Sequence, residues 1–240
     1  MAQARGFVLP MVKTPVDPKR SCRLFRAGSG RERKGLLRNS EGLAYLEFAI
    51  SLPVLLVLGL YGTELAYMAS INMQVSQIAS SVADNASRIG QTDNSGVTPT
   101  VTEAEIDSVL GGAILQGRGI KFNENGRIVL SSLEQDPSSK KQYIHWQRCR
   151  GTLAKESSYG PEGYGKTTGN LLGMGKEGAL IKASGNSSVM FAEVFYSYKG
   201  LFGDMFVGTV EFKQEMAFET RDDRNLTPGV TGDDGDSECS

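Results

Sequence analysis

The sequence has little of the chemistry that metal sites and many active sites require. Its 240 residues contain one histidine and three cysteines. Cys22, Cys149 and Cys239 lie far apart, and none has a second cysteine at the short spacing of a zinc site. We therefore expect no metal ion and no cofactor.

The chain also lacks a large net charge, but the total of -1 hides a sharp division. Residues 1–41 contain ten Lys or Arg and three Asp or Glu, whereas residues 43–240 contain sixteen basic and twenty-four acidic residues. Because an acidic body has no basic footprint, we expect no nucleic-acid partner. A basic leader before an apolar segment instead predicts a membrane protein with its N-terminus in the cytoplasm and its body exported.

The apolar segment itself is short. Between Glu47 and Glu64 lie sixteen uncharged residues, FAISLPVLLVLGLYGT, which span about 24 Å as a helix, less than the roughly 30 Å hydrocarbon core. A helix over residues 43–69 reaches about 40 Å but includes both acids. We expect this longer span, with Glu64 at its exported boundary. A signal peptide is the alternative, but no small-x-small cleavage site follows the segment.

Apolar residues continue beyond the span at helical steps of four and three. They are Ile71, Val75, Ile78, Val82, Ala86 and Ile89. Mostly polar residues fill the positions between them, so we expect one helix to continue over residues 70–90, with this stripe packed on a domain. Gly90 is a stop signal.

The remainder predicts an exported α+β domain over residues 91–232, with a helix packed on an antiparallel sheet. We expect a capped helix from Thr102 to about Gly111, a hairpin over 120–133 with its turn at 123–126, and a frayed acidic tail at 233–240. Further strands are expected at 142–148, 189–198 and 207–220, and an irregular glycine-rich excursion at 151–185.

The junction between the basic leader and the apolar run resembles a known processing site. Gly42 is followed by Leu43-Ala44-Tyr45-Leu46-Glu47-Phe48, which reads G-x-x-x-x-E-F and continues as EFAISLPVLLVL. This pattern is similar to the TadE-like family of minor pilins, or pseudopilins, of the tight-adherence (Tad) pilus. Weaker similarity recurs at HWQRCRG (145–151), VMFAEVFYSYKGLF (189–202) and AFETRDDRNL (217–226).

The resemblance implies a pilin-like fold and a role in pilus assembly and surface adhesion. It implies cleavage of the leader, residues 1–42, after Gly42 by a prepilin peptidase of the bacterial inner membrane, so that Leu43 begins the mature protein. In such families the acid at Glu47, followed by Phe48, meets the free N-terminal amine of a subunit during assembly; alternatively, Glu47 is solvated at the headgroup level. The implied partners are the peptidase, other pilins and pseudopilins, the inner-membrane assembly platform and the lipid bilayer.

Other functions remain open at this stage. A type II secretion pseudopilin would share the helix and the acid, and an uncleaved, membrane-anchored periplasmic binding module would need neither cleavage nor a filament. An enzyme is the least favoured reading. Gly173–Gly178 matches G-x-G-x-x-G, but it lies in the glycine-rich excursion and not in a βαβ unit. His145 has no evident nucleophile or orienting acid.

Export also leaves an even pair of cysteines. Cys22 lies in the leader and leaves with it, so Cys149 and Cys239 remain in an oxidising compartment, where disulfides persist. We expect a disulfide between them; two free thiols or a bridge to a second subunit are the alternatives.

Overall fold

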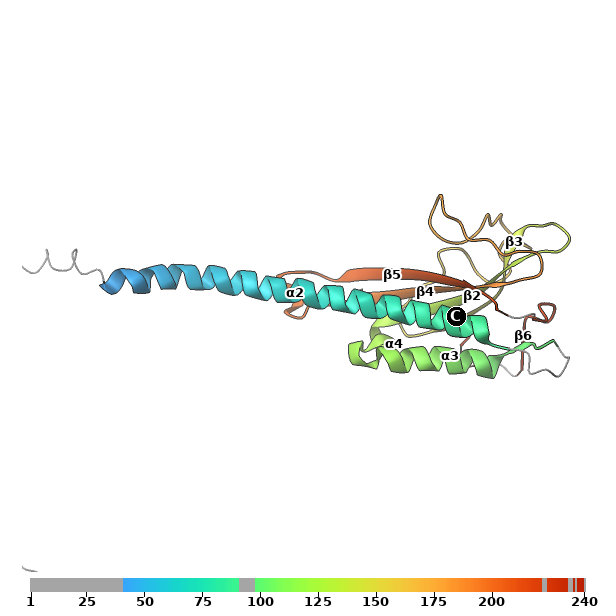
Figure 1. Cartoon of the computed structure of the whole chain (residues 1–240), viewed down its shortest axis with the longest axis horizontal. Helices are drawn as coiled ribbons and strands as arrows, with labels where there is room; N and C mark the ends of the chain where they lie inside the picture. Colours follow the sequence, from blue (N-terminus) through green and yellow to red (C-terminus); the bar gives the residue numbers. More distant parts are fainter. Residues whose placement is uncertain (1–40, 91–97, 222–223, 233–234, 236, 240) are drawn as a thin grey trace, which may run out of the picture. The chain divides into compact units, whose positions relative to one another are not determined.

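The structure, a computed structural model, describes residues 41–90, 98–221, 224–232, 235 and 237–239. A long apolar N-terminal helix is followed by a small antiparallel sheet with further helices (Figure 1), which confirms the predicted α+β, pilin-like layout. The predicted leader lies outside the described residues except for its last two positions. The chain divides at Val54–Leu55 into two units, both of which contain part of the long helix.

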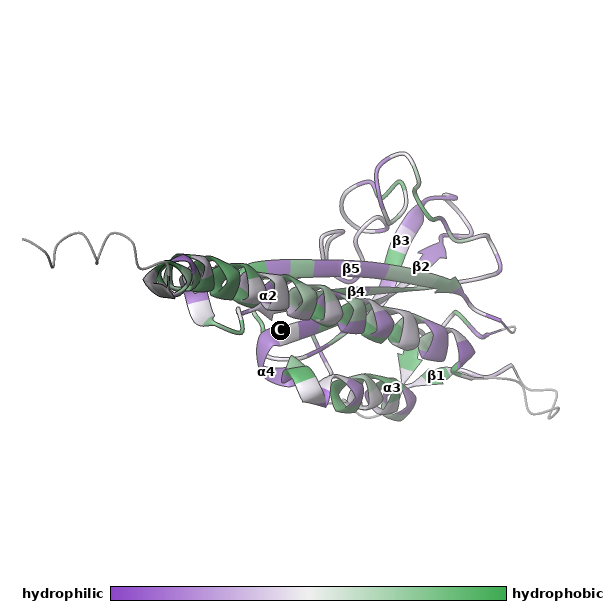
Figure 2. Cartoon of the chain, turned by 60° about the vertical axis from the view of Figure 1, so that its left-hand side comes forward, coloured by the Kyte–Doolittle hydropathy of each residue, from purple (hydrophilic) through white to green (hydrophobic). Residues whose placement is uncertain are grey.

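Helix α2 (Glu41–Arg88) has two unlike halves. Residues 42–63 are exposed all round, and Figure 2 shows this part of the helix as mostly apolar. The helix is long and apolar enough to cross a membrane. From Glu64 onward one face of the helix is buried in the domain, and a more polar face remains outside.

The helical stripe predicted from the sequence is confirmed. Every member is at most 8% exposed: Ile71, Val75, Ile78, Val82, Ala86 and Ile89. They pack in one core with the facing side chains of the sheet, including Leu130, Val194 and Phe212. Because burying a Val or Ile side chain is worth roughly 1.5–3 kcal/mol, the larger members together dominate the attachment of α2 to the sheet.

Helix α3 (Glu103–Gln116) begins where the sequence predicts it. Thr102 is the N-cap, and its hydroxyl oxygen and the Glu105 carboxylate form a reciprocal capping box. The predicted end near Gly111 is wrong, because the helix continues for another turn and more. Leu110 and Ala113 are buried against the core, and this packing outweighs the low helix propensity of glycine.

The predicted hairpin over residues 120–133 is also wrong. Its predicted first arm and turn instead fall at the end of a 3₁₀ helix, η1 (Gly117–Ile120), and in a short helix, α4 (Phe122–Asn125). Phe122 is fully buried and stacks on Tyr196, with 6.0 Å between ring centroids. A Cβ on Gly117 or Gly126 would lie within 2.6 Å of Phe122 atoms, so these glycines let the chain wrap the ring.

The second arm does form a strand, which pairs on one side with the next strand along the chain and on the other side with a strand that is distant in sequence. The sheet has the order β3-β2-β4-β5, with every pair antiparallel. Its strands are β2 (Gly126–Gln135), β3 (Gln142–Arg150), β4 (Val189–Tyr198) and β5 (Val210–Glu219). The predicted strands at 142–148, 189–198 and 207–220 are therefore confirmed. A separate parallel pair joins β1 (Val101–Thr102) to β6 (Val230–Thr231).

Both faces of the sheet are covered. Helix α2 packs on one face, and Figure 2 shows it running alongside β4 and β5. The irregular segment 151–188 lies over the other face, where Leu171, Met174 and Ala183 pack on Leu133 and Phe191. Because both faces are covered, β2 and β4 are buried almost throughout and do not alternate between buried and exposed residues.

The C-terminal tail is not frayed where it is described, contrary to the sequence expectation. The Ser237 carbonyl accepts a hydrogen bond from the Cys149 amide at 2.6 Å, and Ser237 itself is fully buried. Cys239 is disulfide-bonded to Cys149, the pair expected from the sequence, across 90 positions. Sequence composition suggested fraying because it does not reveal that an edge strand is available to bind the tail.

We predict that this disulfide contributes to stability. Closing a loop of this length is worth about 4–5 kcal/mol in the chain-entropy model, but disulfides typically contribute less than this, about 2–4 kcal/mol. We therefore expect Cys239→Ser to lower the free energy of unfolding by about 2–4 kcal/mol. Denaturant unfolding followed by the fluorescence of Trp146 measures the loss, and Cys22→Ser is the matched control. Alkylation of Cys149 and Cys239 without prior reduction would contradict the bond itself.

Candidate assembly and membrane site

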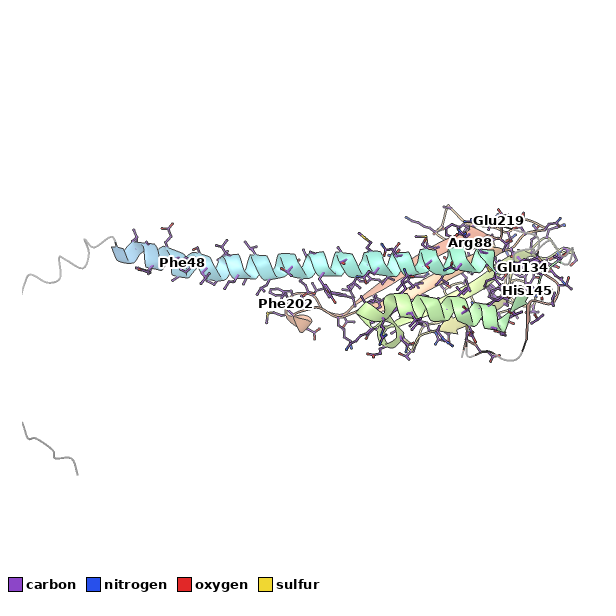
Figure 3. All side chains as sticks on the ribbon, turned by 60° about the horizontal axis from the view of Figure 1, so that its bottom comes forward. Phe48, Arg88, Glu134, His145, Phe202 and Glu219 are labelled. Atoms are coloured by element: carbon purple, nitrogen blue, oxygen red, sulfur yellow. A yellow bond between two sulfur atoms is a disulfide. The ribbon has the colours of Figure 1, made fainter. Side chains whose placement is uncertain are left out.

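The residues of the predicted processing and assembly site lie together at the start of α2. Gly42, Leu43, Glu47 and Phe48 are all exposed, with Leu43 at 65% and Phe48 at 60%. These residues belong to the exposed N-terminal half of α2, residues 42–63, which we call the bare half. Figure 3 labels Phe48 on it. No described atom lies within 4 Å of where a Gly42 Cβ would be, so the fold of this chain does not itself require glycine there.

Glu47 has no partner among the described residues. It is the only charged residue between Gly42 and Thr63, and no hydrogen bond or ion pair joins it to the described part of the chain. Leu43 and Glu47 are four positions apart on a helix, so they lie one above the other on the same face. A molecule that contacts this face meets both residues.

Glu64, the acid at the other end of the apolar run, is in the opposite situation. Its side chain is fully buried, and its carboxylate accepts three hydrogen bonds. The Tyr198 hydroxyl donates at 2.5 Å, the Leu201 amide at 3.0 Å and the Phe202 amide at 3.2 Å. The interpretation of Glu64 as a mere boundary of the span is therefore wrong, because the carboxylate fixes α2 to the end of β4.

The surroundings of this carboxylate favour the observed hydrogen bonds. Burial, followed by the bond to Glu64, raises the pKa of the Tyr198 hydroxyl, so the phenol stays protonated and can donate. Gly200 lets the chain pass close to the carboxylate, since a Cβ there would lie 3.0 Å from Glu64 Oε1 and 2.5 Å from the Gly203 carbonyl oxygen. The rings of Tyr67 and Phe212 flank Tyr198.

One signal in the sequence could have placed Glu64 correctly. Met68, which packs against the core, and Ile71 follow Glu64 at steps of four and three. Glu64 therefore lies on the same helical face as the buried stripe, extended by two steps toward the N-terminus. A buried acid on such a face needs donors, but its donors come from the end of β4 and from the connection after it, more than 130 residues away, which no local pattern identifies.

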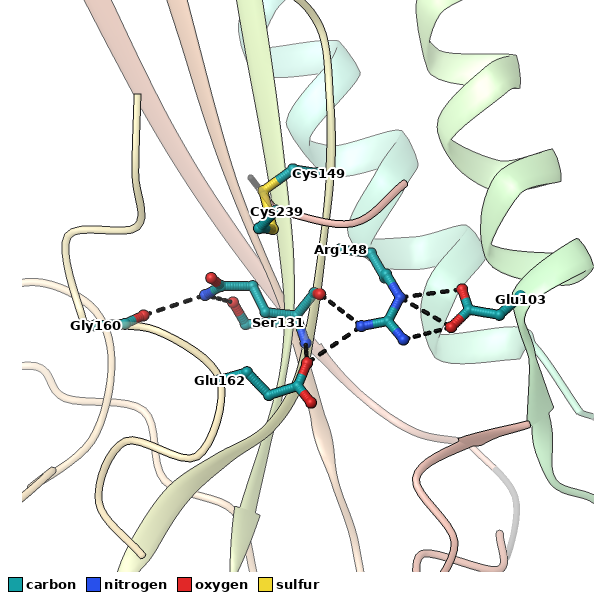
Figure 4. Close-up of polar contacts among 8 residues, drawn as sticks. Glu103, Ser131, Arg148, Cys149, Gly160, Glu162 and Cys239 are labelled. Atoms are coloured by element: carbon teal, nitrogen blue, oxygen red, sulfur yellow. Dashed lines mark hydrogen bonds and ion pairs between the residues drawn. A yellow bond between two sulfur atoms is a disulfide. The ribbon is translucent and has the colours of Figure 1, made fainter. Parts of the chain in front are cut away.

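A second polar cluster holds the tail, α3 and the irregular segment on β3 (Figure 4). Arg148 Nε donates to both carboxylate oxygens of Glu103 at 3.0 Å, and Arg148 Nη1 pairs with Glu162 Oε2 at 3.2 Å. The Cys149–Cys239 bond lies beside this cluster. Because the arginine joins three segments, we interpret the cluster as structural.

His145 does have an acid at hydrogen-bonding distance, Glu134, contrary to the sequence expectation. It is skipped by the pairing at a β-bulge, between Trp146 paired with Ser132 and Ile144 paired with Leu133. Its Nδ1 lies 2.9 Å from Glu134 Oε2, and the Ser132 hydroxyl donates to the other oxygen of that carboxylate. The serine therefore bonds to the acid and not to the histidine, which is not the order of a nucleophile, base and acid.

The G-x-G-x-x-G sequence has no dinucleotide-binding context. Met174, inside Gly173–Gly178, is fully buried against the sheet, and residues 170–188, all described, contain no helix. A dinucleotide site needs a helix N-terminus at that point.

Comparisons of this chain with protein-family models, with curated proteins and with solved structures found no match. The function of this chain therefore has to be inferred from the motif at Gly42–Phe48 and from the geometry of α2.

We predict that the hydroxyl of Tyr198 matters more to stability than that of its neighbour on the same face. Hydrogen bonds to charged groups are worth about 1.5–3 kcal/mol and neutral ones about 0.5–1.5 kcal/mol. Tyr198→Phe should therefore destabilise the domain more than Tyr196→Phe, which removes a 2.8 Å bond to the Ile120 carbonyl. Denaturant unfolding of the full chain in detergent measures both losses, and equal losses would show that Tyr198 does not hold the carboxylate.

Proposed function

We propose that this chain is a minor pilin of a Tad-type adhesion pilus, anchored in a bacterial inner membrane before assembly. The observation that carries the proposal is the unlike nature of the two halves of α2. One half is bound to the chain's own sheet, whereas the other exposes apolar residues on every side with Glu47 as its only charge.

The bare half needs an apolar environment that this chain does not supply. Lipid provides it while the protein is in the membrane, and the helices of other pilins provide it in a filament. Transfer from lipid to neighbouring helices leaves the apolar side chains covered, so the hydrophobic cost of leaving the membrane is small.

Glu47 then gives assembly its specificity. An ionised carboxylate in a low-dielectric environment needs a partner. Cleavage after Gly42 by a prepilin peptidase creates an ammonium group on Leu43, and the same helical face carries both groups. A neighbouring subunit can thus offer an ammonium to Glu47 and take part in a repeated contact.

The disulfide supports an exported location for the domain. Disulfides persist in oxidising compartments, and the Cys149–Cys239 bond lies in the body that follows the apolar helix. The N-terminal leader, with its excess of basic residues, would then remain in the cytoplasm. In this proposal the domain acts through contacts with other pilins and with the assembly platform, and it performs no catalysis.

The first test is processing. N-terminal sequencing of the protein extracted from membranes of cells with an active prepilin peptidase should find Leu43 as the first residue. Gly42→Ala should retain most cleavage, whereas the bulky change Gly42→Leu should block it. Gly59→Leu is the matched control, because Gly59 is also an exposed helical glycine with no described atom near its Cβ position. An intact leader on the parent protein would overturn the pilin assignment.

The second test concerns assembly. Glu47→Ala should leave cleavage intact and abolish pilus formation, and Glu47→Gln should also fail if the charge is what matters. Ser51→Ala is the control, since Ser51 lies one turn further along the same face and, among the described residues, its hydroxyl bonds only to the Phe48 carbonyl. Counting pili by electron microscopy gives the result. Normal piliation in both Glu47 variants would show that this acid only sits at the membrane surface.

A further inference from the structure

The connection between β4 and β5, residues 199–209, exposes apolar side chains where a turn is usually polar. Leu201 is 51% exposed and Met205, at the end of the 3₁₀ turn η2 (Gly203–Met205), is 75% exposed. Phe202 and Phe206 are half-buried and pack edge to face on each other, 5.8 Å between centroids. A cluster of exposed apolar residues of this kind marks a contact surface.

The same connection is bound to α2 at the point where the bare apolar run ends. The ring of Phe206 lies 6.0 Å from that of Tyr61, and the amides of Leu201 and Phe202 donate to Glu64. Figure 3 shows Phe202 beside α2. Any layer that surrounds the helix as far as Tyr61 therefore also reaches this connection.

The length of the helix places the edge of a bilayer at this level. From Leu43 to Tyr61 α2 rises about 28 Å, close to the roughly 30 Å of a hydrocarbon core. A span reaching Ala69 would be about 40 Å and would place the Glu64 site and its loop inside the lipid. Tyrosine at the end of the shorter span also fits the aromatic preference of membrane interfaces.

We infer that the β4–β5 connection inserts Leu201, Phe202, Met205 and Phe206 into the headgroup–acyl boundary of the bilayer, as a second membrane contact beside α2. This inference rests on the proposed membrane anchoring. The exposed charges in the connection, Lys199 and Asp204, are of opposite sign, so the contact is apolar and needs no anionic lipid. Insertion fixes the orientation of the domain at the membrane surface before assembly.

Tryptophan fluorescence tests the depth of this connection. The chain has one tryptophan, so Met205→Trp in a Trp146→Phe background gives a single reporter. The full chain is placed in phosphatidylcholine vesicles containing lipids brominated either near the headgroup or deep in the acyl chain. We expect blue-shifted emission that shallow bromines quench strongly and deep bromines quench weakly.

Two matched reporters separate the possible failures. Leu172→Trp, on an exposed apolar residue of segment 151–188, should remain unquenched, whereas Leu56→Trp, within the bare run, should be quenched by the deep bromines. The three tryptophan substitutions can also be made with Trp146 retained, in case Trp146→Phe disturbs the fold. Quenching is then measured as the difference from the parent protein, in which Trp146 is buried, at 4% exposed.

The result for Met205→Trp decides the inference. Water-like, unquenched emission there, with Leu56→Trp quenched, would overturn the loop insertion and leave the membrane anchor intact. Absence of quenching at both positions would overturn the anchoring as well. Blue-shifted emission that is insensitive to bromine and lost on dilution would also overturn the inference, because a second copy of the chain would then cover the connection.

Discussion

The structure depends on one constraint: the two halves of a single continuous helix have different surroundings. The stripe from Ile71 to Ile89 is buried by the chain's own sheet, whereas residues 42–63 have no cover within the described chain. The sheet presents one face to α2 and α3, and its other face is covered by the irregular segment 151–188. The domain therefore buries one half of the helix and leaves the other half, which is long and apolar enough to cross a membrane, exposed.

Three buried carboxylates of the domain differ in whether their partners are charged or neutral. Glu193, on β4, has the Lys213 ammonium at 3.3 Å as well as donors from Ser157 and Ser158. Glu103 has the Arg148 guanidinium. Glu64 differs from these two, because the donors to its carboxylate are all neutral: a phenol and two backbone amides. Neutral donors satisfy the carboxylate without adding a cation next to the apolar run, and they order the β4–β5 connection at the same time.

The sequence predicts those features that depend on local periodicity or on a short motif. The helical stripe, the capping box at Thr102 and the strands β3, β4 and β5 all follow from patterns within about fifteen residues. The misplaced hairpin, the longer α3 and the docked tail depend on distant contacts instead. Phe122 stacks on Tyr196 in the core, and the donors of Glu64 come from the end of β4 and from the β4–β5 connection. Such partners become visible only when the sheet order is known.

The two acids that bracket the apolar run therefore have different meanings, although the sequence presents them as equivalents. They lie seventeen residues apart on one helix, with uncharged residues between them. Glu64 has its hydrogen-bonding needs met by the chain itself, so it adds nothing to the demand for an external partner. Glu47 has no such bonds among the described residues, and lipid cannot satisfy a carboxylate. Because only Glu47 lacks a partner among the described residues, a helix that packed beside residues 42–63 would have a single charged group to match. In the proposed assembly this single charge sets the register of the contact along the helix, where the apolar side chains alone would permit sliding.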